Sequence, residues 1–200
     1  MTQQRKRIGL FGGSFNPVHI GHMMLAQYLA QFADFDEVWL LLSPSNPLKV
    51  NELSTSRATD TQRLEMLQAA SASDTRIRVC DIELSMPRPS YTVDTLRRLA
   101  ELYPDTDFTL IIGSDNWLIF DRWRNHQYIL DNFRVAVYPR PGYPLPTTSG
   151  HPNVSFLLSA PQIEISSSFI RQSIAKGYDM SHFLPPPLPS YIKDHKLYTS

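Results

Sequence analysis

The sequence predicts a single α/β domain built on a parallel sheet with helices on both faces. A continuous apolar run at 38–42 and a mostly apolar run at 108–112 have the composition of strands buried on both faces, as the strands of a parallel sheet are. Segments with the apolar spacing of helices alternate with such runs along the chain, which is the order of βαβ units. The 200 residues are enough for one domain with a sizeable core.

The first half of the chain holds three predicted strands and two predicted helices. A short apolar run at 7–11 is the first strand, and it leads into a glycine-rich turn. Apolar residues between 25 and 32 recur at the i, i+3, i+4, i+7 spacing of one helix face. The run 38–42 ends at a Ser-Pro pair and is the second strand. A helix is expected around 57–72, and the alternating pattern of 77–82 predicts an edge strand.

The second half continues this alternation. A helix carrying Val93, Leu96 and Leu99 should follow Tyr91-Thr92, and a buried strand should end at Gly113. The remaining predicted elements are two short helices within 117–130, strands at 133–138 and 154–158, a helix from 166 to 176, and a short helical tail at about 185–200. The whole pattern indicates a Rossmann-like, doubly wound fold over residues 1–200.

Composition excludes several classes of function. The formal net charge is zero and 19% of the residues are charged, whereas a general nucleic-acid binder has a basic excess. Cys80 is the only cysteine, so the chain forms no internal disulfide and suits a reducing cytoplasm. No run approaches the ~20 apolar residues of a membrane helix. We therefore expect a soluble cytoplasmic protein without nucleic-acid or membrane partners, and the sequence leaves open whether it forms a homo-oligomer.

A glycine-rich corner follows the first strand. Residues 12–22 read Gly-Gly-Ser-Phe-Asn-Pro-Val-His-Ile-Gly-His. The two glycines are expected to let the backbone turn sharply and approach a ligand, because neither carries a Cβ. The helix should begin close to Gly21, where free N–H groups and the positive end of the helix dipole favour an anion. With His19 and His22 at the same place, the corner predicts a phosphate site.

Other interpretations of this corner must be weighed on the residues alone. It lacks the Gly-x-Gly-x-x-Gly spacing of dinucleotide folds and the Gly-Lys-Ser/Thr ending of a P-loop. His19 and His22 have the spacing of a metal-binding pair, but a zinc site needs at least a third protein ligand. The corner can also be a tight turn with two incidental histidines.

A second stretch, Ile165 to Arg171, has the features of an anion site at a helix start. Ser166 is the expected N-cap, and Ser167 and Arg171 are four residues apart and so lie on one helix face. Hydroxyls, free N–H groups and a guanidinium would then converge on one anion. A serine cap beside a solvated arginine is the alternative.

These two stretches carry a resemblance to a known family. His-Ile-Gly-His at 19–22 matches the His-x-Gly-His signature of the nucleotidyltransferase superfamily, and the longer string 12–22 looks like that of bacterial nicotinate-nucleotide adenylyltransferases. The stretch 165–171 resembles the family's second motif, which holds ATP phosphates. The resemblance implies ATP binding by Gly12, Gly13, Ser14, Phe15, His19, Gly21, His22, Ser166, Ser167, Ser168 and Arg171. It implies catalytic roles for His19, His22 and Arg171.

Other matches concern the acceptor. Pro-Ser-Tyr-Thr at 89–92 resembles the segment that contacts the nicotinate carboxylate, and Trp123 aligns with a tryptophan that stacks on the pyridine ring. Asp115 matches an aspartate near the bound nucleotide, and Lys49 matches a phosphate or loop contact. The resemblance thus implies acceptor binding by Lys49, Tyr91, Thr92, Asp115 and Trp123. Two departures are Leu48, where the family commonly has His, and Asn16, where many members have Asp.

The resemblance implies transfer of AMP from ATP to nicotinate mononucleotide, giving deamido-NAD and pyrophosphate, with Mg²⁺ accompanying the ATP. No resident metal ligands are expected. Transfer of an adenylyl or cytidylyl group to another phosphorylated acceptor, such as phosphopantetheine, is a rival hypothesis. A nucleotide-sensing protein that has lost turnover is a rival from a different class.

Overall fold

The computed structural model describes residues 5–44 and 58–199. Its centre is a six-stranded, fully parallel sheet in the order β3-β2-β1-β4-β5-β6. The strands are β1 (Lys6–Gly13), β2 (Glu37–Leu42), β3 (Ile77–Cys80), β4 (Thr106–Gly113), β5 (Arg134–Tyr138) and β6 (Val154–Phe156). The predicted Rossmann-like sheet is confirmed, including the place of 77–80 at one edge. The last strand is shorter than predicted, ending at Phe156.

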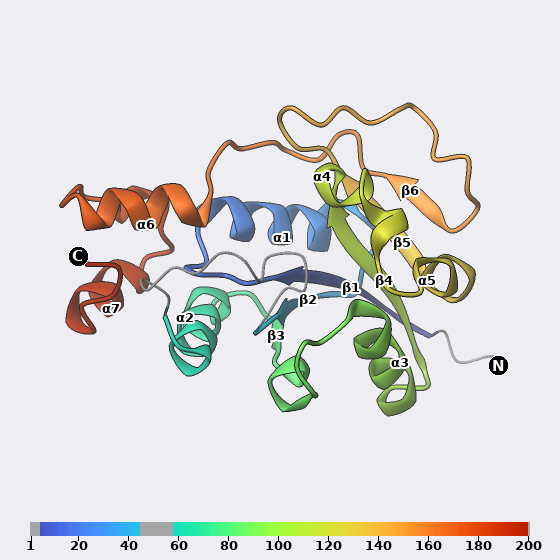
Figure 1. Cartoon of the computed structure of the whole chain (residues 1–200), viewed down its shortest axis with the longest axis horizontal. Helices are drawn as coiled ribbons and strands as arrows, with labels where there is room; N and C mark the ends of the chain where they lie inside the picture. The colour runs from blue at the N-terminus through green and yellow to red at the C-terminus, as the bar shows by residue number, and fades with distance from the viewer. Residues whose placement is uncertain (1–4, 45–57, 200) are drawn as a thin grey trace.

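Seven α-helices connect or flank these strands within the described ranges (Figure 1). They are α1 (Ile20–Phe32), α2 (Asp60–Ser71), α3 (Thr92–Leu102), α4 (Ser114–Trp117), α5 (His126–Asn132), α6 (Ser167–Ala175) and α7 (Leu188–Asp194). Short 3-10 turns occur at Ile82–Ser85, Phe120–Arg122 and Ser181–Phe183. The expected pair of short helices in 117–130 is replaced by α4, which already begins at Ser114, the 3-10 turn after it, and α5.

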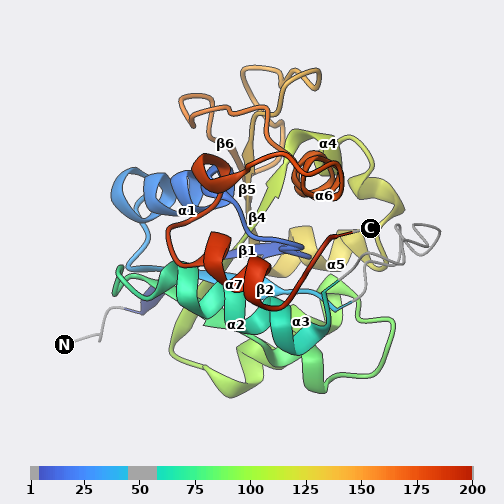
Figure 2. The ribbon, with the colours of Figure 1, turned by 90° about the vertical axis from the view of Figure 1, so that its left-hand side faces the viewer.

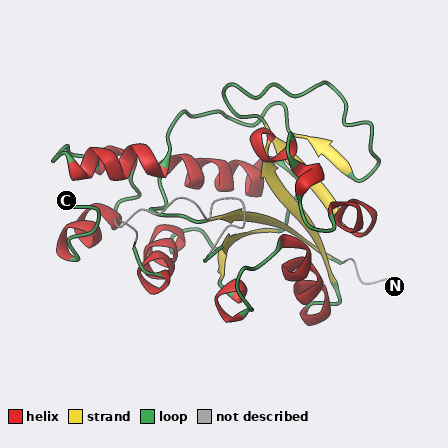
Figure 3. Cartoon of the chain, viewed as in Figure 1, coloured by secondary structure: helices red, strands yellow, loops and turns green. Residues whose placement is uncertain are grey.

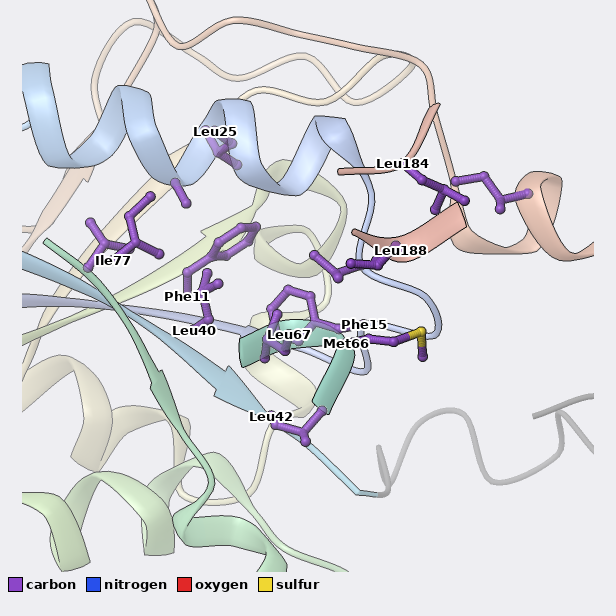
Figure 4. Close-up of a cluster of buried hydrophobic side chains, with 14 of the residues drawn as sticks. Phe11, Phe15, Leu25, Leu40, Leu42, Met66, Leu67, Ile77, Leu184 and Leu188 are labelled. Carbon is purple, nitrogen blue, oxygen red and sulfur yellow. The ribbon is translucent and has the colours of Figure 1, made fainter. Parts of the chain in front are cut away.

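Two apolar cores lie on opposite faces of the sheet, because side chains alternate along each strand. Phe11 and Leu40 belong to the core that packs against α1, α2 and the C-terminal segment. Leu10 and Trp39, their neighbours in sequence, belong to the core that packs against α3 and α5. Figure 4 shows the first of these cores, and Figure 3 shows helices above and below the sheet.

The C-terminal part of the chain packs back on the domain. Helix α7 contacts α2, and Leu188 and Ile192 of α7 are buried in the first core. Figure 2 shows α6, α7 and the chain end together at one end of the molecule. The predicted helical tail is therefore an integral part of the packing.

The strand order places a crevice beyond the carboxyl ends of the central strands β1 and β4. The connections from β1 and from β4 run in opposite directions, because β2 and β5 lie on opposite sides of this central pair. Open parallel sheets bind their ligands at such a switch point, beyond the carboxyl ends of the strands. The residues just after β1 and β4 are the glycine-rich corner and Ser114-Asp115.

Candidate active site

A cavity of about 570 Å³ lies over the switch point. The loops after β1 and β4 line it together with the first turns of α1, α3 and α6. The predicted site residues among its lining are Gly12, Gly13, Ser14, Phe15, His19, Gly21, His22, Tyr91, Thr92, Asp115, Trp123, Ser166, Ser167, Ser168 and Arg171. Lys49 lies outside the described residues. The sequence motifs, although up to 159 positions apart, thus come together in one cavity.

The sharp turn expected at the two glycines of the corner falls just after them, at Phe15, whereas the expected room for a ligand is present at Gly12. Gly12 and Gly13 end β1, and the left-handed residue of the turn is Phe15, with a φ of 43°. A Cβ on Gly13 would come within 2.9 Å of the Phe15 ring, and a Cβ on Gly21 within 2.7 Å of Ile163. A Cβ on Gly12 would meet nothing within 4 Å, so a ligand can approach the backbone there.

The two histidines form a stacked pair at the start of α1. Their ring centroids are 3.6 Å apart, and the ring planes are inclined by 25°. His19 is the N-cap residue, and its backbone N–H donates a hydrogen bond of 3.2 Å to Nδ1 of His22. Because Nδ1 accepts, the proton of a neutral His22 lies on Nε2. His22 is also packed against Phe15, with ring centroids 5.0 Å apart.

Both imidazoles are neutral near pH 7. Burial, together with the smaller effect of the charge of Arg140, lowers the pKa of His19 to about 4. Burial likewise lowers the pKa of His22 well below its usual value, with His19 and Arg140 adding to the effect. The buried Nδ1 of His19 has no hydrogen-bond partner within the described ranges. The pair therefore offers neutral donors and acceptors to a ligand.

The start of α6 closes the cavity opposite the corner. Ser166 caps the helix as predicted, accepting a hydrogen bond of 3.1 Å from the N–H of Phe169. Ser167 donates to the carbonyl of Pro17, and Arg171 donates through Nη1 to the carbonyl of Asn16 at 2.8 Å. The second motif is thus fastened to the loop of the first.

Arg63 of α2 is a site residue that sequence reasoning missed. Arg63 is only 4% exposed. Its guanidinium donates to the carbonyls of Ser14 and Ser43, which follow β1 and β2, and it pairs with Asp60 at 2.5 Å. These carbonyls at the strand ends need donors, and one arginine supplies them to two loops. Nothing in the spacing of α2 distinguishes Arg63 from a solvated arginine.

Arg140 was also missed, because it stands in a stretch that reads only as the end of a strand. It lines the cavity beside Asp115, with 3.6 Å between Nη1 and Oδ2. Oδ1 of Asp115 is buried and has no hydrogen-bond partner in the part of the chain that the structure describes. The backbone N–H of Arg140 donates to the hydroxyl of Ser114, which ties the loop after β5 to the end of β4.

The start of α3 lies at another part of the cavity wall. Tyr91 is its N-cap residue and Thr92 its first residue, so the unpaired N–H groups of the first turn are here. A buried carboxylate, Glu83, accepts hydrogen bonds from the hydroxyls of Ser90 at 3.1 Å and Thr95 at 2.7 Å. Glu83 thereby holds the segment before the helix against its first turn. It too was missed, since a lone glutamate carries no sequence signal.

Trp123 is half-buried at the edge of the second core and lines the cavity. Its ring lies 5.2 Å from that of Phe120, centroid to centroid, and its Nε1 has no partner among the described residues. Arg124, next to it, stacks over the ring of Tyr91 at 4.7 Å. Trp123 thus has packing on one side and the cavity on the other.

Two features are absent from the residues that the structure describes. No three His, Cys, Asp or Glu side chains gather there in a way that would hold a metal ion. No helix in those ranges has the length and apolar character needed to cross a membrane.

The fold and this site define a class of enzyme. The family model described as cytidylyltransferase-like matches residues 10–173, which include every element of the cavity from β1 to α6. The chain is a nucleotidyltransferase of this α/β class.

Relatives with similar sequences show which family of nucleotidyltransferases this chain belongs to. A protein of Bacteroides thetaiotaomicron named "Probable nicotinate-nucleotide adenylyltransferase" is 46% identical over 196 residues, covering 98% of this chain and 95% of the relative. A protein of the same name from Azobacteroides pseudotrichonymphae is 49% identical over 180 residues, with 90% and 92% covered. The chain belongs to the nicotinate-nucleotide adenylyltransferase family.

A solved structure agrees with the fold. The nicotinic acid mononucleotide adenylyltransferase of Plasmodium falciparum, complexed with NaAD, superposes with a TM-score of 0.78. The two chains are 20% identical, and the match covers 96% of this chain and 97% of the other. At this identity the likeness concerns the fold, and it extends over nearly the whole chain.

Proposed function

We propose that this protein transfers AMP from ATP to nicotinate mononucleotide, producing deamido-NAD and pyrophosphate in NAD biosynthesis. One observation carries the proposal: the two phosphate motifs and the two acceptor features line the same cavity. A phosphate site alone would fit many nucleotide-binding proteins. The aromatic wall at Trp123 and the helix start at Thr92 add places for a flat ring and for a second anion. The family membership supports the same reaction.

In the proposed reaction, a phosphate oxygen of the acceptor attacks the α-phosphorus of ATP. The bond from that phosphorus to the oxygen bridging to the β-phosphate breaks, and pyrophosphate leaves with the electron pair. The acceptor phosphate is already anionic near pH 7, so no strong general base is needed. Positioning and stabilisation of charge then supply most of the catalysis.

The histidine pair fits the α-phosphate. A neutral His22 carries its proton on Nε2. Its Nε2–H can donate a hydrogen bond to a phosphate oxygen as negative charge grows there. His19 offers its unpartnered Nδ1 beside it, in a site whose helix start already favours an anion. Arg171 and the first turn of α6 would hold the phosphates that leave as pyrophosphate.

The other wall of the cavity fits the acceptor. The first turn of α3 presents unpaired N–H groups and the positive end of the helix dipole, which favour a carboxylate over a neutral amide. The half-buried ring of Trp123 offers a face for the pyridine. The carboxylate of Asp115, which lines the cavity, is an acceptor suited to a ribose hydroxyl. Lys49 keeps its proposed role as a phosphate or loop contact.

Mg²⁺ would enter with ATP rather than reside in the protein. Adjacent phosphates of ATP can chelate Mg²⁺. Bound in this way, it would neutralise charge on the leaving pyrophosphate.

A panel of acceptors tests the proposal. ATP and Mg²⁺ are supplied with nicotinate mononucleotide, nicotinamide mononucleotide or phosphopantetheine, and dinucleotide product and pyrophosphate are both measured. We expect product with nicotinate mononucleotide and less with the amide, because the amide lacks the charge that α3 favours. Transfer to phosphopantetheine alone would establish the rival acceptor. ATP binding without pyrophosphate release from any acceptor would indicate a sensor.

The same panel on Trp123 variants tests the aromatic wall. Trp123→Ala should weaken the binding of nicotinate mononucleotide by about 1–3 kcal/mol, which is the usual effect of losing stacking on an aromatic residue. Trp123→Phe should recover part of the loss, and ATP binding should change little in either variant. If Trp123 is merely part of the core, alanine should lower the melting temperature and weaken both substrates together.

A further inference from the structure

Asn16, in the loop after β1, joins four segments that are far apart in sequence. It is 4% exposed. Its side-chain Oδ1 accepts hydrogen bonds from the N–H of Ala58 at 3.2 Å and from the hydroxyl of Tyr198 at 2.8 Å. Its backbone carbonyl accepts from Nη1 of Arg171 at 2.8 Å. The loop of the first motif, the approach to α2, the second motif and the chain end all meet at this residue.

Tyr198 reaches Asn16 by an unusual path of the chain end. After α7, the backbone reverses through Lys196 and Tyr198, whose φ values are 50° and 63°. A bulky residue adopts positive φ only at a cost of order 1–3 kcal/mol, so surrounding contacts must hold it there. The ring packs in the first core, and the side chain is 4% exposed. Burial raises the pKa of the phenol, so its hydroxyl stays a donor at all ordinary pH values.

The bond from Tyr198 ends on a residue that orients the phosphate end of the cavity. The guanidinium of Arg171 is anchored on the carbonyl of the same Asn16, and a second bond joins its Nη2 to the hydroxyl of Ser168 at 3.3 Å. A shift of Asn16 would move the anchor of Arg171 and the cavity wall beside it together. The position of the guanidinium that would meet a bound phosphate therefore depends on where Asn16 is held.

We propose that Tyr198 is a positioning residue for the ATP end of the site, acting through Asn16 on Arg171. The hydroxyl fixes the side chain of Asn16 from the side remote from the ligand, while the ring supplies ordinary packing. The last described turn of the chain is therefore part of the support of the active site. The identity of the ligand as ATP rests on the proposed function, whereas the geometry of the support does not.

Tyr198→Phe separates the two roles of this side chain, because phenylalanine keeps the ring and removes the hydroxyl. We expect KM for ATP to rise about 3- to 10-fold, the effect of losing one buried hydrogen bond. We expect kcat to stay within about twofold and KM for the acceptor to stay at its wild-type value. The matched control is Tyr178→Phe, since Tyr178 is 66% exposed, and it should behave as wild type. Equal KM values for ATP in the Tyr198→Phe variant and wild type would overturn the proposal.

Variants of Asn16 test the path of the effect. Asn16→Asp keeps an oxygen that can accept from Tyr198 and Ala58 and should retain ATP affinity, whereas Asn16→Ala should lose it. In the Asn16→Ala background, Tyr198→Phe should cause no further loss, because residues acting through one contact are not additive. Additive losses, or a lower melting temperature with ATP and acceptor weakened alike, would show that Tyr198 contributes packing only.

Calorimetric binding of a non-hydrolysable ATP analogue separates this inference from the proposed reaction. If wild type forms no dinucleotide but binds the analogue, the proposed reaction fails and the comparison of Tyr198→Phe with wild type still tests the support. If wild type is active and Tyr198→Phe binds the analogue as tightly as wild type does, the positioning of Arg171 by Tyr198 through Asn16 is refuted. The proposed reaction then stands.

Discussion

At the scale of single residues, the stacked histidines are kept neutral by burial and by Arg140, and this has a consequence for stability. The pKa of His19 is about 4 in the folded protein and about 6.5 when unfolded. As pH falls, the unfolded chain therefore takes up the proton first. The stabilisation is fully present above pH ~6.5 and is lost progressively towards pH ~4. For His19 the loss is on the order of 3 kcal/mol.

Urea unfolding between pH 7 and pH 4 checks this prediction. The free energy of unfolding should fall across this window in wild type, and the fall should be smaller in His19→Gln. His195, which is exposed, provides the control: His195→Gln should keep the wild-type dependence. If His19→Gln and wild type lose stability equally, the folded-state pKa of His19 is not depressed.

At the scale of elements, the first turn of α6 works as a unit with the loop after β1. Among the described residues, Arg171 donates through Nη1 to the carbonyl of Asn16 and through Nη2 to the hydroxyl of Ser168. Lysine carries the same charge but acts as a point donor and cannot reproduce this geometry. Arg171→Lys should therefore weaken the binding of ATP by about 1.5–3 kcal/mol, the effect of losing a charge-assisted hydrogen bond. Binding of the acceptor should stay largely intact.

Equilibrium titrations with each substrate measure this effect. Arg98→Lys is the matched control, because Arg98 lies on the exposed side of α3 and pairs with Glu101. If Arg171→Lys lowers the affinity for the acceptor alone, Arg171 has been assigned to the wrong substrate.

At the scale of the whole molecule, the sequence predicts the sheet and most of the helices because burial patterns are local. A strand buried on both faces needs a continuous apolar run, and an amphipathic helix needs a fixed apolar spacing. The two phosphate motifs are also local, since each is a loop and the helix start that follows it. The two motifs come together because of the fold, in which the carboxyl ends of all strands of a parallel sheet lie on the same side.

The parts that the sequence did not predict are contacts between distant segments. Arg63, Glu83 and Arg140 each looked like an ordinary surface residue, and only the fold brings them to loop carbonyls, hydroxyls or the histidine pair. The same holds for Tyr198, which is 182 positions from Asn16. A pattern read within one segment carries no information on such partners.

The central claim is that His22 stabilises the reacting phosphate through Nε2, and two variants test it against each other. Asn can keep the hydrogen bond from the N–H of His19 but has no donor near the position of Nε2, whereas Gln can place an amide N–H there. With melting temperatures and substrate affinities measured as controls, the rate of deamido-NAD formation is compared. We expect a fall of ~10²–10³ in kcat for His22→Asn and partial recovery in His22→Gln. Near wild-type turnover in a folded His22→Asn variant would contradict it.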